Sequence, residues 1–138
     1  MKRLLPVLFL FLCSSFLLSA QTQIEVEITN FKSTKGVAFI GLYDSESSFL
    51  NTALIGEKLL IKNNKVVYTF KDIPPGNYAI SVFHDEDENG ELTTNFLGIP
   101  KESYGASNNA PSRFGPPKWK DARFRVTPGE TVYQKIRL

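Results

Sequence analysis

The sequence predicts an all-β protein, an antiparallel seven-stranded Greek-key β-sandwich that carries one long ordered loop. Apolar residues recur at alternate positions in short segments, which is the pattern of strands with one buried face. Turns rich in Gly, Pro and Asn separate these segments, and no convincing helical pattern follows residue 20. Many short strands with frequent turns are typical of two antiparallel sheets packed face to face.

The first four strands are expected before residue 71. Residues 24–28 alternate three apolar side chains with two glutamates, whereas residues 37–43 form a more continuous apolar run that suits a central strand. Short strands follow at residues 59–61 and 66–70. The Asn63-Asn64 pair between them predicts a tight turn, so we expect these two strands to form a hairpin.

The other three strands come after the Pro74-Pro75-Gly76 turn, where proline presets φ and glycine accepts a positive φ. Alternating apolar residues predict a buried strand over 78–84. The last two strands are predicted at 122–126 and 132–138, joined by a turn at Pro128-Gly129.

The segment 95–120 shows no periodicity, and half of its residues are Gly, Pro, Ser or Asn. A loop of this length is uncommon in a compact domain and is usually functional. Large apolar side chains recur along it, so we expect it to be pinned to the sandwich rather than disordered.

Residues 1–20 are predicted to be a cleaved signal peptide. Lys2 and Arg3 precede an apolar stretch too short to span a bilayer comfortably, and Ser19-Ala20 offers a small-residue cleavage site. Residues 21–138 are then one domain, exported to the periplasm or outside the cell, with no transmembrane segment after cleavage. Cleavage removes Cys13, the one cysteine, and leaves about zero net charge. We therefore expect no nucleic-acid partner, and the net charge gives no electrostatic reason to expect anionic lipid as a partner.

The strongest local motif is the acidic turn that follows the strand at 78–84. Asp85, Asp87 and Asn89 stand at alternate positions before Gly90, as in the first half of a calcium loop. Alternating short side chains on a tight turn direct their oxygens to one point, and Ca²⁺ prefers six to eight such ligands. The predicted metal ligands are Asp85, Asp87, Asn89, Glu91 and Asn95, with Glu102 as a further donor.

An alternative interpretation keeps the turn without the metal. Asn89-Gly90 is a preferred pair for a two-residue β-hairpin, and the acidic side chains would then be solvated. The calcium pattern also lacks its bidentate glutamate, because the twelfth position of the loop is Phe96. Calcium is therefore a predicted cofactor that the sequence leaves open.

Catalytic groups are scarce in this sequence. His84 is the single histidine, and a zinc site would need several His or Cys ligands. A catalytic triad would have to use His84, yet alternation along the strand sends the side chain of Asp85 to the opposite face. We therefore expect a protein that is not an enzyme, in which the His84 ring anchors the acidic turn or the 95–120 loop.

A binding module suits these residues better than an enzyme does. Aromatic residues of the long loop can form a platform for a sugar ring or an apolar peptide, or they can be plugs that hold the loop down. The predicted function is an accessory module of the cell envelope that binds a glycan or a protein. The alternative is a small periplasmic hydrolase that uses His84 and nearby carboxylates. The predicted ligand-binding residues are His84, Tyr104, Asn108, Phe114 and Trp119.

The order of the motifs resembles one bacterial family. The segments that carry the resemblance are IPPGNYAI (73–80), HDEDENGEL (84–92), LGIPKESYGASN (97–108) and GPP (115–117). They are similar to the domain of unknown function 2141 family over nearly all of residues 21–138, which implies an exported β-sandwich with no assigned activity. Asp87, Thr93 or Thr94, and Ala106 depart from the family's usual Asn, Asp and Phe, and the missing Asp removes one calcium ligand. The Pro-Pro-Gly-x-Tyr turn also resembles carboxypeptidase-regulatory domains, which implies an immunoglobulin-like or transthyretin-like sandwich.

Overall fold

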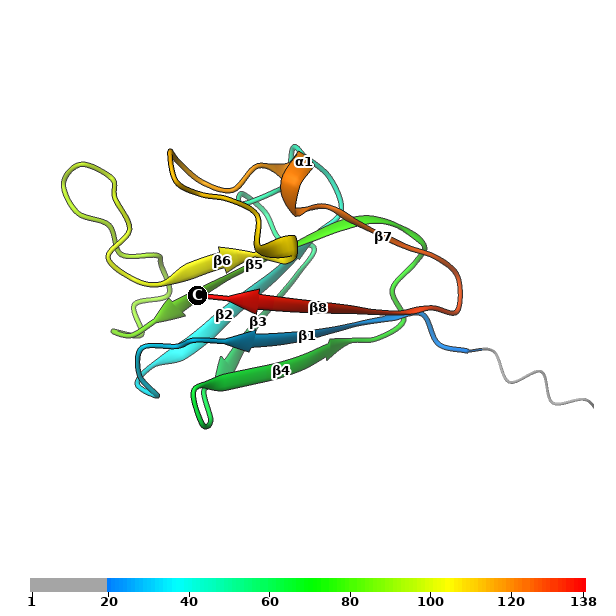
Figure 1. The fold of residues 1–138 in the computed structure, drawn as a ribbon, viewed down its shortest axis with the longest axis horizontal. Helices are drawn as coiled ribbons and strands as arrows, with labels where there is room; N and C mark the ends of the chain where they lie inside the picture. Colours follow the sequence, from blue (N-terminus) through cyan, green and yellow to red (C-terminus); the bar gives the residue numbers. More distant parts are fainter. Residues whose placement is uncertain (1–19) are drawn as a thin grey trace, which may run out of the picture.

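The computed structural model describes residues 20–138, so the predicted signal peptide at 1–20 lies almost entirely outside the described residues. Two sheets build the fold, and the only helical segments among these residues are two short ones (Figure 1). This confirms the all-β class. The strands are β1 (Gln23–Thr29), β2 (Val37–Tyr43), β3 (Ile55–Leu60), β4 (Lys65–Phe70), β5 (Gly76–Asp85), β6 (Tyr104–Ala106), β7 (Phe124–Val126) and β8 (Thr131–Arg137); the helical segments are η1 (Ser107–Asn109) and α1 (Trp119–Ala122).

Eight strands are present where the sequence predicted seven. The additional strand is β6, which lies inside the segment expected to be an irregular loop and pairs with β5 through Ser81 to Phe83. The prediction of a strand that starts at Ala122 is wrong at that end, because Ala122 ends the four-residue helix α1.

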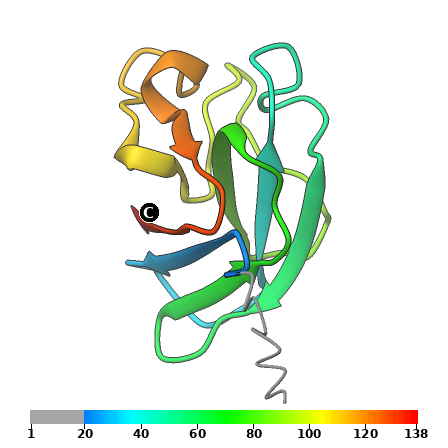
Figure 2. The ribbon, with the colours of Figure 1, turned by 90° about the vertical axis from the view of Figure 1, so that its right-hand side faces the viewer.

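One sheet has the order β4-β1-β8 and the other the order β3-β2-β5-β6, with β7 also paired to β5. Figure 2 shows the two sheets facing each other. The prediction of an antiparallel sandwich is wrong for one pair of strands, because β1 and β8 run parallel. These strands come from opposite ends of the domain, so no local turn encodes their relative direction. The predicted Greek-key connectivity is not established by this strand order and stays a prediction.

The core lies between the two sheets, and it is built by the predicted alternation. Even-numbered residues of β1, β2 and β5 face inward, and full burial of a Val, Leu or Ile side chain contributes roughly 1.5–3 kcal/mol. The almost fully buried members of this set are Ile24, Val26, Ile28, Ala38, Ile40, Leu42, Ile80 and Val82.

The predicted hairpin at 59–70 is correct at its turn and wrong in its pairing. Asn63 and Asn64 both have positive φ, and Lys62 and Lys65 exchange two backbone hydrogen bonds around them. Beyond that turn β3 pairs with β2 and β4 pairs with β1, so the chain crosses from one sheet to the other. Within residues 20–138, no helix has the length and apolar character required to cross a membrane.

Candidate binding groove and acidic turn

The outer face of the five-stranded sheet carries a row of aromatic side chains. Phe39 of β2 and Phe83 of β5 are cross-strand partners, and their rings stack with centroids 4.9 Å apart. Tyr104 of β6 pairs with Phe83 on the other side, and Lys58 Nζ lies 4.8 Å from the centroid of the Phe39 ring. Aromatic residues at these outward positions replace the polar residues that a solvated face normally carries.

A groove of about 720 Å³ opens over the part of this row formed by Phe83 and Tyr104. Residues of the loop 92–100 form one wall, and residues 112–117 form the other. Arg113 is the one charged residue among the described residues that line the groove, and none of them has a carboxylate or carboxamide side chain. An apolar lining with a few polar groups is typical of ligand sites.

The segment between the two walls is fixed to the sandwich by η1. Ser107 is fully buried, and its Oγ accepts a hydrogen bond from the Ile80 N–H (2.9 Å) and donates one to the Ala122 carbonyl (2.6 Å). Asn109 binds the edge of β8 twice, through the Lys135 carbonyl (3.1 Å) and the Arg137 N–H (2.9 Å). The groove walls therefore start from a rigid base. The long segment is pinned mainly by these hydrogen bonds, and the prediction that its large apolar side chains would pin it is wrong for most of them, since Phe96, Leu97, Ile99 and Phe114 are exposed.

His84 lies on the inner face near the end of β5, and its side chain is fully buried. Its Nε2 lies 2.6 Å from the Lys35 carbonyl oxygen, so the ring binds the turn between β1 and β2. Nδ1 has no hydrogen-bond partner among the described residues, and Glu86 Oε1 is 3.6 Å away. The ring was predicted to anchor the acidic turn or the 95–120 loop. Its hydrogen bond goes to the Lys35 carbonyl instead, and its contact with the acidic turn is the 3.6 Å approach of Nδ1 to Glu86 Oε1. The backbone N–H of His84 reaches the 95–120 loop at the Ser103 carbonyl (2.8 Å).

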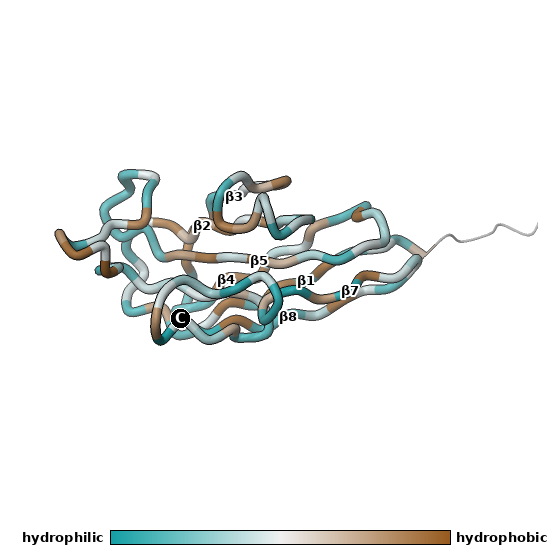
Figure 3. Tube along the Cα trace, turned by 90° about the horizontal axis from the view of Figure 1, so that it is seen from above, coloured by the Kyte–Doolittle hydropathy of each residue, from teal (hydrophilic) through white to brown (hydrophobic). Residues whose placement is uncertain are grey.

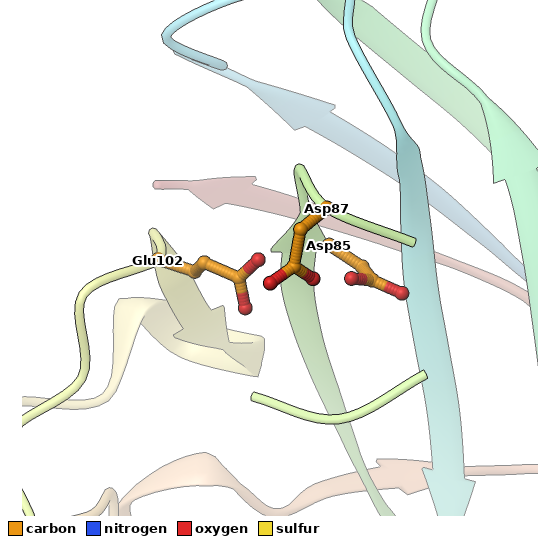
Figure 4. A group of neighbouring side chains, drawn as sticks. All are labelled: Asp85, Asp87 and Glu102. Atoms are coloured by element: carbon orange, nitrogen blue, oxygen red, sulfur yellow. The ribbon is translucent and has the colours of Figure 1, made fainter. Parts of the chain in front are cut away.

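Three carboxylates of the acidic turn converge, those of Asp85, Asp87 and Glu102, with oxygens within 4.8 Å of one another (Figure 4). Asp85 is fully buried, and its two oxygens accept the N–H groups of Asn89 (3.2 Å) and Gly90 (2.9 Å). Glu102 is nine-tenths buried and accepts two further N–H groups of the same loop. Backbone dipoles thus offset the charge of two of the three carboxylates.

The sequence motifs along β5, the acidic turn and β6 are shared with a recognised family. Residues 26–134, well over half of the chain, match the family described as "Uncharacterized protein conserved in bacteria (DUF2141)". The chain belongs to the DUF2141 family. No curated protein and no solved structure matches it.

The acidic turn of this DUF2141 protein holds two of the five predicted metal ligands together. Asn89 and Asn95 use their side-chain oxygens in local turns, toward the Glu91 N–H (2.8 Å) and the Leu97 N–H (2.9 Å). Glu102 completes the cluster because the pairing of β6 with β5 brings it back to the turn. Calcium binding stays a prediction.

The alternative of a hairpin turn at Asn89-Gly90 is wrong. Positive φ occurs at Glu88 and Gly90 but not at Asn89, whereas a type I′ turn needs it at both central residues. The chain then makes a long excursion before β6 returns to pair with β5.

The predicted ligand-binding residues other than His84 lie in four different environments. Tyr104 lines the groove. Asn108 donates through Nδ2 to three backbone carbonyls of residues 121–123, so its side chain is engaged within the fold. Trp119 is half-buried against Phe49 with ring centroids 5.9 Å apart, as expected for a plug, whereas Phe114 is fully exposed.

The sequence reasoning missed Ser81 and Phe83 on the groove floor. The sequence did contain a signal: β2 and β5 carry large apolar residues on their outward positions as well as on their inward ones. On a solvated face, the outward residues Phe39 and Phe83 would be polar. Residues that break the alternation in this way indicate a second covered face.

Proposed function

We propose that this DUF2141 protein is a non-catalytic binding module that holds an apolar segment of a partner protein in the groove between residues 92–100 and 112–117. The observation that carries the proposal is the aromatic floor of Phe83 and Tyr104 between two walls whose intervening segment is hydrogen-bonded to the core. A pre-formed site loses little conformational entropy when a ligand enters. This role suits an accessory protein of the cell envelope.

The lining favours a peptide over a glycan. Sugar hydroxyls need several converging polar side chains, whereas the groove offers Arg113, three hydroxyl side chains of Ser or Thr and two tyrosines, among mainly apolar groups. An apolar peptide would bury its side chains against Phe83 and Ile99. Arg113 would bind a backbone carbonyl or a carboxylate of the peptide.

The position of His84 supports binding rather than catalysis. A general base must come within about 2.6–3.2 Å of the proton that it removes. The His84 ring is fully buried and occupied by the Lys35 carbonyl, so a substrate in the groove has no access to it.

Selection from a phage-displayed library of random peptides tests the proposal. We expect enrichment of apolar peptides whose binding is lost in Tyr104→Ala and retained in Tyr133→Ala, the matched control on the exposed face of the three-stranded sheet. Hydrogen exchange of the bound protein should slow at residues 81–83 and 104–106. No enrichment, or unchanged binding in Tyr104→Ala, would refute the proposal. Capture on a glycan array that depends on Tyr104 would replace the peptide by a glycan.

A further inference from the structure

Three large apolar side chains of the loops project into solvent and do not line the groove. Phe96 is 95% exposed, Leu97 68% and Phe114 103%. The two loops that carry them rise on the same side of the sandwich (Figures 1 and 2), and the leftmost loop of Figure 1 has an apolar tip in Figure 3. Large apolar groups gathered on one exposed face mark an interaction surface.

Within residues 92–120, the exposed charges all have one sign. Between Leu92 and Lys120 the exposed charged residues are Lys101, Arg113, Lys118 and Lys120. Glu102 is the only acidic residue of this segment, and both of its oxygens are bound to backbone N–H groups inside the loop. None of the four basic side chains forms an ion pair with another residue in the range 20–138. Residues 92–120 therefore present apolar tips together with exposed groups that are all cationic, and the exposed Asp121 directly follows this segment.

We propose that Phe96, Leu97 and Phe114 dock the protein on an anionic lipid surface. Side chains on separate projecting loops would each need a pocket on a protein partner, whereas a bilayer interface buries them without matching pockets. The surrounding lysines and Arg113 match the negative charge of lipid phosphates. This docking does not depend on the proposed groove function, because none of the three tips lines the groove.

The preceding turn limits how much charge attraction can contribute. Glu86, Asp87, Glu88 and Glu91 are exposed there and oppose an anionic surface. Insertion of the apolar tips must therefore supply most of the affinity, and attraction by the basic residues must weaken as salt is added.

Co-sedimentation of the purified protein with lipid vesicles tests the inference. We expect binding to vesicles of phosphatidylcholine and phosphatidylglycerol, weaker binding to phosphatidylcholine alone, and a partial loss of binding when salt is added. The double variant Phe96→Ala, Phe114→Ala should bind at least ~10-fold more weakly. Tyr133→Ala, which removes an exposed aromatic side chain away from the loops, should bind like the wild type. Phe96→Trp should show a blue-shifted indole emission when anionic vesicles are added.

Two outcomes would overturn the inference. One is a wild-type protein that stays in solution with anionic vesicles, and the other is a double tip variant that binds them as tightly as the wild type. Peptide selection on the double variant separates this result from the groove proposal, since loss of vesicle binding should leave peptide binding unchanged.

Discussion

Asn108 and Gln134 bind each other through two hydrogen bonds in opposite directions. The backbone N–H of Asn108 donates to Gln134 Oε1 (3.0 Å), and Gln134 Nε2 donates to Asn108 Oδ1 (3.3 Å). Asn108 has a positive φ of 58°, and its Nδ2 reaches carbonyls of residues 121–123. The side chain of Asn108, in η1, thus links β8 to residues 121–123, which follow the groove wall at 112–117.

Asn108→Ala should therefore destabilise the protein more than the loss of one surface side chain would. The substitution removes the side-chain hydrogen bonds of Asn108 to Gln134 Nε2 and to the carbonyls of Asp121 and Arg123, and it places Ala at positive φ. The carbonyl of buried Ala122 loses one of two donors, because Ser107 Oγ still binds it. We expect the free energy of unfolding in urea to fall by about 2–4 kcal/mol. Asn64→Ala is the matched control, because Asn64 also has positive φ (55°) and lies in an exposed turn. Equal losses in the two variants would show that backbone strain alone explains the effect.

Alternation predicted the strands whose inner face is buried. In β1 and β8 each inward apolar residue is flanked by outward polar residues, so the local sequence reports burial directly. The edge strand β3 was predicted four residues too late, because its first half contains Gly56 and Glu57 and gives no apolar pattern. Strand β6 has three residues in a glycine-rich segment, and only its long-range pairing with β5 makes it a strand.

The candidate sites were predictable only where their residues are close together in the sequence. Asp85 and Asp87 are close in sequence, so their convergence follows from a tight turn. Glu102 and the groove walls depend on how the 86–118 segment folds back onto β5, which no local pattern specifies. The buried position of His84 toward Lys35 depends on the turn before β2, a segment without any motif.

Gly36→Ala should prevent the turn before β2 from closing. Gly36 has φ +69°, and a Cβ there would overlap the Asp85 carbonyl oxygen and lie 2.8 Å from the Cα of Glu86. Because the obstacle is backbone, we expect a loss of roughly 3 kcal/mol or more in the free energy of unfolding. Gly56→Ala, where a Cβ meets nothing within 4 Å, should change it by less than about 0.5 kcal/mol. Similar melting temperatures for the two variants would contradict this account.

The buried phenol of Tyr78 should make the protein less stable at alkaline pH. Burial raises the pKa of the Tyr78 phenol above its ordinary value of about 10, and the nearby charge of Asp44 raises it further. The neutral phenol donates to the Pro74 carbonyl (2.6 Å). Its contribution is complete below pH ~10 and is lost as the pH rises through the folded-state pKa.

Unfolding in urea between neutral and strongly alkaline pH measures this contribution. Tyr78→Phe should lower the free energy of unfolding by about 0.5–1.5 kcal/mol at neutral pH and should flatten its alkaline decline. Tyr133→Phe removes an exposed phenol and should leave the curve as in the wild type. An unchanged alkaline slope in Tyr78→Phe would mean that another group titrates.

The hydrogen bonds from backbone N–H groups to the Asp85 carboxylate should hold the acidic turn whether or not calcium is added. In Asp85→Asn an amide donor would face the N–H of Asn89 or Gly90, both of which now donate to a fully buried carboxylate. We expect the free energy of unfolding to fall by about 1–3 kcal/mol in a chelator and in calcium alike. Asp87→Asn is the control, because Asp87 is exposed and carries the same charge.

Calorimetric melts of the wild type and both variants in chelator and in calcium separate the two explanations of the turn. If backbone N–H groups alone hold the turn, Asp87→Asn should change the free energy of unfolding by less than about 0.5 kcal/mol. The hydrogen bonds that it loses are exposed, and the substitution relieves the repulsion of Asp87 with Asp85 and Glu102. With a bound cation, the wild type should melt at a higher temperature in calcium, and Asp87→Asn should remove that rise. A loss in Asp85→Asn that appears only in calcium would show that its carboxylate serves the cation rather than the backbone.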